Sequence, residues 1–214
     1  PHYHVLSRRQ RQMCIRYSIY IGQWKNGEMN GQVTYIWGQN SKKSGAKAMP
    51  YSAEISRTHP TCFLFLIDQS GSMSDQASNL MMTKAQFVSD ALNRVVMNLI
   101  ARSSKAEGVR DYFEIGVIGY GGNGVRNPLQ GAFAGNVFNP VSLFEQFPLS
   151  VEDRTKKVPD GAGGVNEEKI KFPVWFVPEA TGGTPMKEAL KVAAIELATW
   201  CDNHSDSYPP TVLH

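Results

Sequence analysis

With 214 residues the chain is long enough for one full domain and additional segments, and its 42% hydrophobic content is ordinary for a globular protein. No apolar run approaches the ~18 residues of a membrane span, and no basic-then-apolar leader opens the sequence, so we expect neither a transmembrane helix nor secretion. Three widely spaced cysteines, Cys14, Cys62 and Cys201, favour buried free thiols in a reducing compartment over a disulfide framework. We therefore expect a cytoplasmic protein.

The first 48 residues differ in charge from the rest of the chain. Eight Lys and Arg against one acid give this segment +7, which leaves −4 for residues 49–214 out of the total of +3. A basic segment ahead of an acidic one suggests two parts of different origin, or an arm that binds nucleic acid or a membrane surface. Because the basic residues are dispersed, solvated charge is the more common explanation. We expect two units, residues 1–48 and 49–214.

Residues 17–37 contain the pattern of one β-hairpin. Asn26-Gly27 is a strong signal for a two-residue turn, and the run from Tyr20 to Gly31 resembles one MORN repeat. Repeat folds need about three units, and no second copy is present. The hairpin is therefore either the tail of a longer array or sequence translated ahead of the natural start, for which Met49 is the candidate.

The stretch from Cys62 to Met73 organises the second unit. Its apolar first half lacks polar alternation, which predicts a strand buried on both faces in a parallel sheet. Apolar residues at helical spacing between Asn79 and Ser104 predict the helix that follows. This order places Asp68, Ser70 and Ser72 at the carboxyl end of the sheet, where open α/β sheets bind ligands.

One carboxylate and two hydroxyls in an Asp-x-Ser-x-Ser pattern suit a hard cation. Mg²⁺ takes about six oxygen ligands at roughly 2.0–2.1 Å and keeps several waters, so this set would hold the ion without neutralising it. The ion would stay electrophilic, and a carboxylate from another molecule could fill an open position. The alternative is an ordinary turn or helix-capping cluster, because Ser and Asp favour such positions.

The sequence DQSGSM after an apolar strand resembles the metal-ion-dependent adhesion site (MIDAS) of von Willebrand factor A (VWA) domains. The resemblance implies a Rossmann-like, doubly wound α/β fold with a mostly parallel sheet, which binds proteins through a divalent cation. It also implies that Mg²⁺ or Mn²⁺ is held by four residues of this chain: Asp68, Ser70, Ser72 and, from a later loop, Thr184.

Two features of the sequence bear on the resemblance. Thr184 matches the family position, but its hydroxyl could instead cap the following helix, with Pro185 in the first turn. The family has a second acid after its fourth strand, and residues 210–214 look like the start of that strand. We therefore expect the second acid beyond His214 and a domain that is incomplete at its C-terminal end.

Residues 111–120 alternate enough to form the second strand, and the glycines from Gly119 to Gly124 then give a G-x-G-x-x-G pattern. A dinucleotide site must open a helix at once, whereas Arg126-Asn127-Pro128 cannot continue one smoothly. We therefore reject nucleotide binding and interpret the stretch as a glycine-rich loop near the cation site.

Further along, we predict an edge strand within Leu129–Phe138 and a short helix or turn at Val141–Phe147. Strand-like segments at Leu149–Val158 and Lys169–Val177 predict a long hairpin inserted before the Thr184 loop. Its charged side chains favour a solvated face, with a partner-binding flap near the metal as the alternative. The last helix presents a set of apolar residues to the core: Met186, Leu190, Ala193, Ala194, Leu197 and Trp200.

Three parts of the chain resemble bacterial intracellular A domains associated with tellurite-resistance and stress-response gene clusters: the residues around Asp68, the inserted hairpin, and TGGTPM at residues 181–186. In such clusters, kinase- and phosphatase-like proteins accompany these domains. The resemblance implies an adaptor or scaffold, not an enzyme, that binds an Asp or Glu of a protein partner and no nucleic acid. One alternative is a Mg²⁺-dependent phosphoryl-transfer or hydrolytic enzyme, although the sequence has no P-loop and no candidate base near Ser70 and Ser72. The other is a structural or membrane-associated module built on the MORN-like hairpin.

Overall fold

The computed structural model describes residues 54–77, 80–159 and 164–214, together with four two-residue strands near the N-terminus. In the latter, β1 (Tyr20–Ile21) pairs with β4 (Thr34–Tyr35), and β2 (Trp24–Lys25) pairs with β3 (Glu28–Met29). Trp24 lies opposite Met29, which confirms the hairpin predicted around positions 26–27.

The main body is a mixed α/β domain with a mostly parallel central sheet. Three strands run parallel: β5 (Thr61–Gln69), β8 (Phe113–Gly121) and β13 (Thr211–Leu213). At one edge β10 (Phe138–Pro140) pairs antiparallel with β8, and β9 (Gly124–Arg126) folds back on the end of β8. The sheet order β10-β8-β5-β13 corresponds to the order 3-2-1-4 that begins doubly wound sheets.

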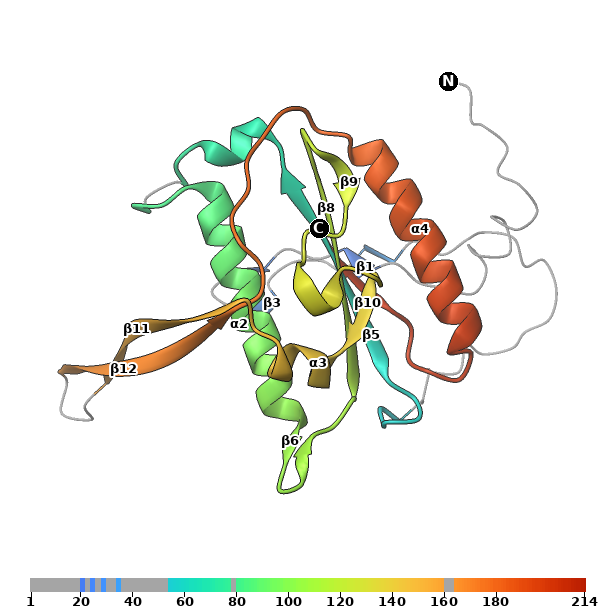
Figure 1. Ribbon diagram of the computed structural model, residues 1–214, viewed down its shortest axis with the longest axis horizontal. Helices are drawn as coiled ribbons and strands as arrows, with labels where there is room; N and C mark the ends of the chain where they lie inside the picture. The colour runs from blue at the N-terminus through green and yellow to red at the C-terminus, as the bar shows by residue number, and fades with distance from the viewer. Residues whose placement is uncertain are drawn as a thin grey trace.

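Both faces of β5 are buried, which explains its continuous apolar run. Phe65 and Ile67 pack on the side of the sheet that α2 (Lys84–Ser103) covers, together with α3 (Val141–Gln146). Leu64 and Leu66 pack on the opposite side, against α4 (Met186–Asn203). Figure 1 shows α2 and α4 on either side of the sheet.

Helix α2 begins later than its apolar pattern predicted. Thr83 caps it, because its hydroxyl accepts a hydrogen bond from the Gln86 N–H while the Gln86 side chain accepts one from the Thr83 N–H. The predicted start at Asn79 is therefore wrong, and a bridge between Gln76 and Thr83 closes a loop before the helix. The apolar pattern is also wider than the buried face, since Phe87 and Val95 are 49% and 37% exposed.

Several shorter elements connect these parts: the 3-10 turns η1 (Gly71–Ser74) and η2 (Gly131–Phe133), and the paired strands β6 (Ser104–Lys105) and β7 (Gly108–Val109). The short helix predicted near Val141 is confirmed as α3. An edge strand is present, but the predicted range Leu129–Phe138 is wrong, because β10 shares only Phe138 with it and Gly131–Phe133 form η2 instead. The glycine-rich stretch closes the β8–β9 hairpin, with Gly124 at φ +78°, and opens no helix.

The long predicted hairpin is present as β11 (Ser150–Pro159) and β12 (Val165–Val174), which pair antiparallel from Ser150↔Val174 to Pro159↔Val165. In Figure 1 this ribbon extends away from the body beside α2. The second strand ends at Val174, so residues 175–177 leave the hairpin earlier than predicted. On α4, Met186 and Leu190 were expected in the core but are 39% and 51% exposed, whereas Ala193 and Trp200 are buried.

Neither α2 nor α4, nor any other helix in the described part of the chain, has the length and apolar character needed to cross a lipid bilayer.

Candidate functional site

The end of β5 brings the three residues of the Asp-x-Ser-x-Ser pattern together. Asp68 is half-buried near the carboxyl end of the strand, Ser70 is 2% exposed, and Ser72 lies exposed in η1. The Ser70 N–H donates to Asp68 Oδ1 at 2.8 Å, which fixes the carboxylate against the turn. The hydroxyls of Ser70 and Ser72 lie 3.2 Å apart.

This oxygen set fits a hard cation. Neighbouring ligands of an octahedral Mg²⁺ lie about 2.9 Å apart, given Mg–O distances of roughly 2.0–2.1 Å. The 3.2 Å between the two hydroxyls is within a few tenths of an ångström of that separation. Asp68 Oδ1 already accepts one hydrogen bond from the backbone, and carboxylate oxygens have further acceptor capacity. The ligands would be one carboxylate and two hydroxyls, all of them oxygens, the element that Mg²⁺ takes as ligand.

The segment that carries Thr184 is joined to this turn through its backbone. The Thr181 N–H donates to the Gln69 carbonyl at 2.8 Å, and the Gly71 N–H donates to the Gly182 carbonyl at 2.9 Å. These two bonds lie on either side of Ser70. On its other side the segment contacts the β8–β9 turn, where the Gly122 N–H donates to the Thr181 carbonyl at 2.6 Å.

Thr184 itself is exposed, two residues after the joined backbone. Its carbonyl accepts a hydrogen bond from the Met186 N–H at 2.8 Å. The capping interpretation is wrong for this structure, because the residue at the N-terminal boundary of α4 is Pro185 and no side chain caps that helix. No hydrogen bond links the Thr184 side chain with Asp68, Ser70 or Ser72 among the described residues.

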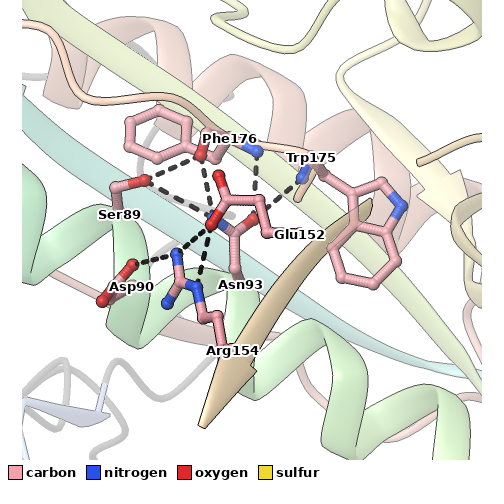
Figure 2. Close-up of polar contacts among 7 residues, drawn as sticks. All are labelled: Ser89, Asp90, Asn93, Glu152, Arg154, Trp175 and Phe176. Carbon is pink, nitrogen blue, oxygen red and sulfur yellow. Dashed lines mark hydrogen bonds and ion pairs between the residues drawn. The ribbon is translucent and has the colours of Figure 1, made fainter. Parts of the chain in front are cut away.

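Buried polar residues of α2 hold the beginning of the same segment. Asn93 Oδ1 accepts hydrogen bonds from the N–H groups of Trp175 and Phe176, each at 3.0 Å. The Phe176 carbonyl accepts from Asn93 Nδ2 at 2.8 Å and from the Ser89 hydroxyl at 2.7 Å. Figure 2 shows both side chains pointing from the helix to this backbone. Asn93 therefore provides, from a side chain, the bonds that a neighbouring strand would provide.

The base of the ribbon is fixed to α2 in the same region. The Arg154 guanidinium contacts Asp90 of α2 at 2.9 Å and Glu152 of its own strand at 2.8 Å, as Figure 2 shows. Its guanidinium carbon also lies 3.8 Å from the centroid of the buried Phe172 ring. The ribbon and the segment leading to Thr184 are thus anchored on one helix.

Sequence reasoning missed Tyr120 and His214. Tyr120 is the register partner of Asp68 on the neighbouring strand, is 1% exposed, and its hydroxyl lies 2.6 Å from His214 Nε2. Burial, with the Asp68 carboxylate as a second cause, raises the pKa of Tyr120 to about 12. Aligning the two parallel strands at their polar carboxyl ends would have found Tyr120.

Glu179 was also missed. Its carboxylate accepts from Asn123 Nδ2 at 2.6 Å and from Gln69 Nε2 at 3.4 Å, and it forms an ion pair with Arg126. These donors come from the end of β5, the β8–β9 turn and β9. One carboxylate therefore ties the segment before Thr184 to three neighbouring parts of the fold. No sequence signal distinguishes Glu179 from an ordinary loop acid.

The described residues contain no group of three or more His, Cys, Asp and Glu side chains arranged to hold a metal ion. The Asp-x-Ser-x-Ser turn is not such a group, since it has one acid and two hydroxyls.

The fold and the turn together define a mixed α/β domain with a polar, oxygen-rich site at the carboxyl end of a mostly parallel sheet. Comparisons of the chain with protein-family models, with curated proteins and with solved structures found no match.

Proposed function

We propose that residues 49–214 form a VWA-type domain that binds a protein partner through a divalent cation. The observation that carries the proposal is the pair of hydroxyls of Ser70 and Ser72, 3.2 Å apart beside the fixed carboxylate of Asp68. Further support comes from the strand order β10-β8-β5-β13, because the turn follows β5, the strand at which the order reverses, and doubly wound sheets bind ligands at such a point.

Asp68, Ser70, Ser72 and Thr184 would hold Mg²⁺ or Mn²⁺. When bound, the cation supplies an electrophilic centre that accepts a carboxylate oxygen from an Asp or Glu of the partner. Asp68 provides the only negative charge among these four residues, so the site would keep net positive charge for that carboxylate. The backbone bonds of Gln69 and Gly71 with the segment that carries Thr184 would hold Thr184 near the other three residues.

We propose binding and not catalysis for this site. Among the described side chains, the hydroxyls of Ser70 and Ser72 hydrogen-bond only to each other. A hydrolytic site would require a base within hydrogen-bond reach of the attacking oxygen. No observation favours the membrane-associated alternative built on the N-terminal hairpin.

The role of the partner carboxylate is tested by water-proton relaxation of Mn²⁺ bound to the full chain. Acetate should displace a water from the bound ion and lower the relaxation enhancement, whereas the neutral acetamide should leave it unchanged. Asp68→Ala should bind no Mn²⁺, while the matched variant Asp202→Ala, which alters an exposed acid near the end of α4, should behave as wild type. Equal responses to acetate and acetamide would contradict the proposed binding mode.

A further inference from the structure

Helix α2 exposes apolar side chains that the described part of the fold does not cover. Phe87, Ala91 and Val95 recur at every fourth position and are all exposed, with Phe87 at 49% and Val95 at 37%. Arg94 and Arg102 are exposed on the same side of the helix. We call these five residues the α2 outer stripe. It extends about 23 Å along the helix, at 1.5 Å per residue.

The stripe carries positive charge without a compensating acid. Neither Arg94 nor Arg102 forms an ion pair within the described part of the chain. The guanidinium carbon of Arg94 lies 5.8 Å from the ring centroid of Phe172. The nearest acid on the helix, Asp90, is already paired with Arg154 of the ribbon. A partner that binds the stripe would therefore form favourable contacts through both apolar side chains and carboxylates.

The stripe also begins beside the candidate cation site. Lys84, in the first turn of α2, has its Nζ 3.5 Å from the Ser72 carbonyl. Phe87 follows less than one helical turn later. A single partner could therefore place one acid on the cation and continue along α2.

We propose that the α2 outer stripe is the docking surface for an acidic amphipathic helix of the protein partner. Such a helix would lay its apolar face on Phe87, Ala91 and Val95, and its acids would pair with Arg94 and Arg102. This inference deepens the proposed function and rests on it only for the acid that reaches the cation.

Charge argues against the two other occupants. Residues 1–48 carry +7, the same sign as the stripe, so the N-terminal segment would be repelled. A second copy would bring two basic stripes together with no acid of the stripe to pair them. An acidic partner satisfies both the apolar and the charged residues.

The test is fluorescence anisotropy with the full chain in Mg²⁺ and a labelled synthetic helical peptide about as long as the stripe. The peptide has Leu at every third or fourth position and Glu on the flanks, and a control peptide has Lys in place of Glu. We expect the Glu peptide alone to bind. The double variant Arg94→Glu, Arg102→Glu should weaken binding at least about tenfold, and Phe87→Ser by a similar factor. Matched changes on α4, Lys187→Glu and Ile195→Ser, should leave binding unchanged.

Two outcomes would overturn the inference: equal binding of both peptides or of neither, and stripe variants that bind as wild type. A dimer of the chain that Phe87→Ser dissociates in light scattering would also overturn it, by assigning the stripe to a second copy.

The variant Asp68→Ala distinguishes this inference from the proposed function. If the stripe variants lose the peptide while Asp68→Ala binds no metal but keeps the peptide, the stripe is confirmed independently of the cation. If Mg²⁺ binding depends on Asp68 but the stripe variants bind the peptide as tightly as wild type, the proposed function stands and the inference is wrong.

Discussion

Gly122 and Gly182 lie in such close contact that a Cβ on Gly182 would overlap the Cα of Gly122. Gly182 also has φ +59°, in the left-handed region that side chains disfavour. This contact brings the segment before Thr184 against the β8–β9 turn. The same segment forms the backbone bonds on both sides of Ser70, so the two glycines determine how close Thr184 comes to the candidate site.

Gly182→Ala should therefore lower the free energy of unfolding by about 1–3 kcal/mol and weaken cation binding. Urea denaturation followed by circular dichroism measures the first effect. Gly183→Ala is the matched control, because a Cβ there meets nothing within 4 Å and the backbone is not left-handed. Equal losses in the two variants would contradict the role of the Gly122–Gly182 contact.

Asn93→Ala should lower the free energy of unfolding by at least about 2 kcal/mol. The change leaves the buried N–H groups of Trp175 and Phe176 without the acceptor that Asn93 Oδ1 provides. Thermal or urea denaturation checks this loss. The same substitution at Asn98, which is exposed on the same helix, should have an effect within about 0.5 kcal/mol of zero. A loss in free energy of unfolding well below about 2 kcal/mol for Asn93→Ala would show that other contacts hold the segment that begins at Trp175.

Arg154→Lys should destabilise the attachment of the ribbon although the charge is kept. Lysine cannot reproduce the planar contact with the Phe172 ring or bind Asp90 and Glu152 with a fork of donors. We expect a loss of about 1 kcal/mol and faster amide exchange in β11 and β12. Lys171→Ala breaks an ion pair whose side chains are 73% and 71% exposed, so it should change stability by less than about 1 kcal/mol. Unchanged exchange in Arg154→Lys would mean that the hairpin is fixed elsewhere.

Tyr120 should give the protein a loss of stability at high pH. Folding raises its pKa from the ordinary value of 10.0 to about 12, so the folded state holds this proton more tightly than the unfolded state. The resulting stabilisation is fully present below pH 10 and is lost as the pH rises through 12. Comparing wild type with Tyr120→Phe by urea denaturation between these pH values isolates the effect, at up to about 1.4 kcal/mol per pKa unit. If the free energy of unfolding changed with pH in the same way in both proteins, the raised pKa of Tyr120 would be contradicted.

The sequence predicted the parts of the fold that depend on continuous apolar runs and on strong turn residues. The buried strand that includes Cys62 and the ribbon are present where such signals are clear, whereas the final strand near Thr211 was expected only from the family resemblance. The start of α2 was wrong because loop residues 80–82 are apolar and extend the helical pattern, although Thr83 and Gln86 cap the helix later.

The candidate site was predictable only in part. Asp68, Ser70 and Ser72 are neighbours in the chain, so their juxtaposition follows from one turn. Glu179 and Tyr120 join the site through tertiary contacts with residues more than fifty positions away, and no local pattern encodes those contacts. The sequence also could not predict which apolar residues of α2 stay exposed. Periodicity gives the positions of apolar residues on a helix but not the width of the surface that covers them.

Calorimetric titration of Mg²⁺ into the full chain, beside Asp68→Ala and Asp202→Ala, tests the central claim most directly. The proposed site predicts that wild type and Asp202→Ala bind one Mg²⁺ with similar affinity and that Asp68→Ala loses it. Binding that is equal in all three proteins, or absent from wild type, would mean that the Asp-x-Ser-x-Ser turn of this chain is a structural turn and holds no cation.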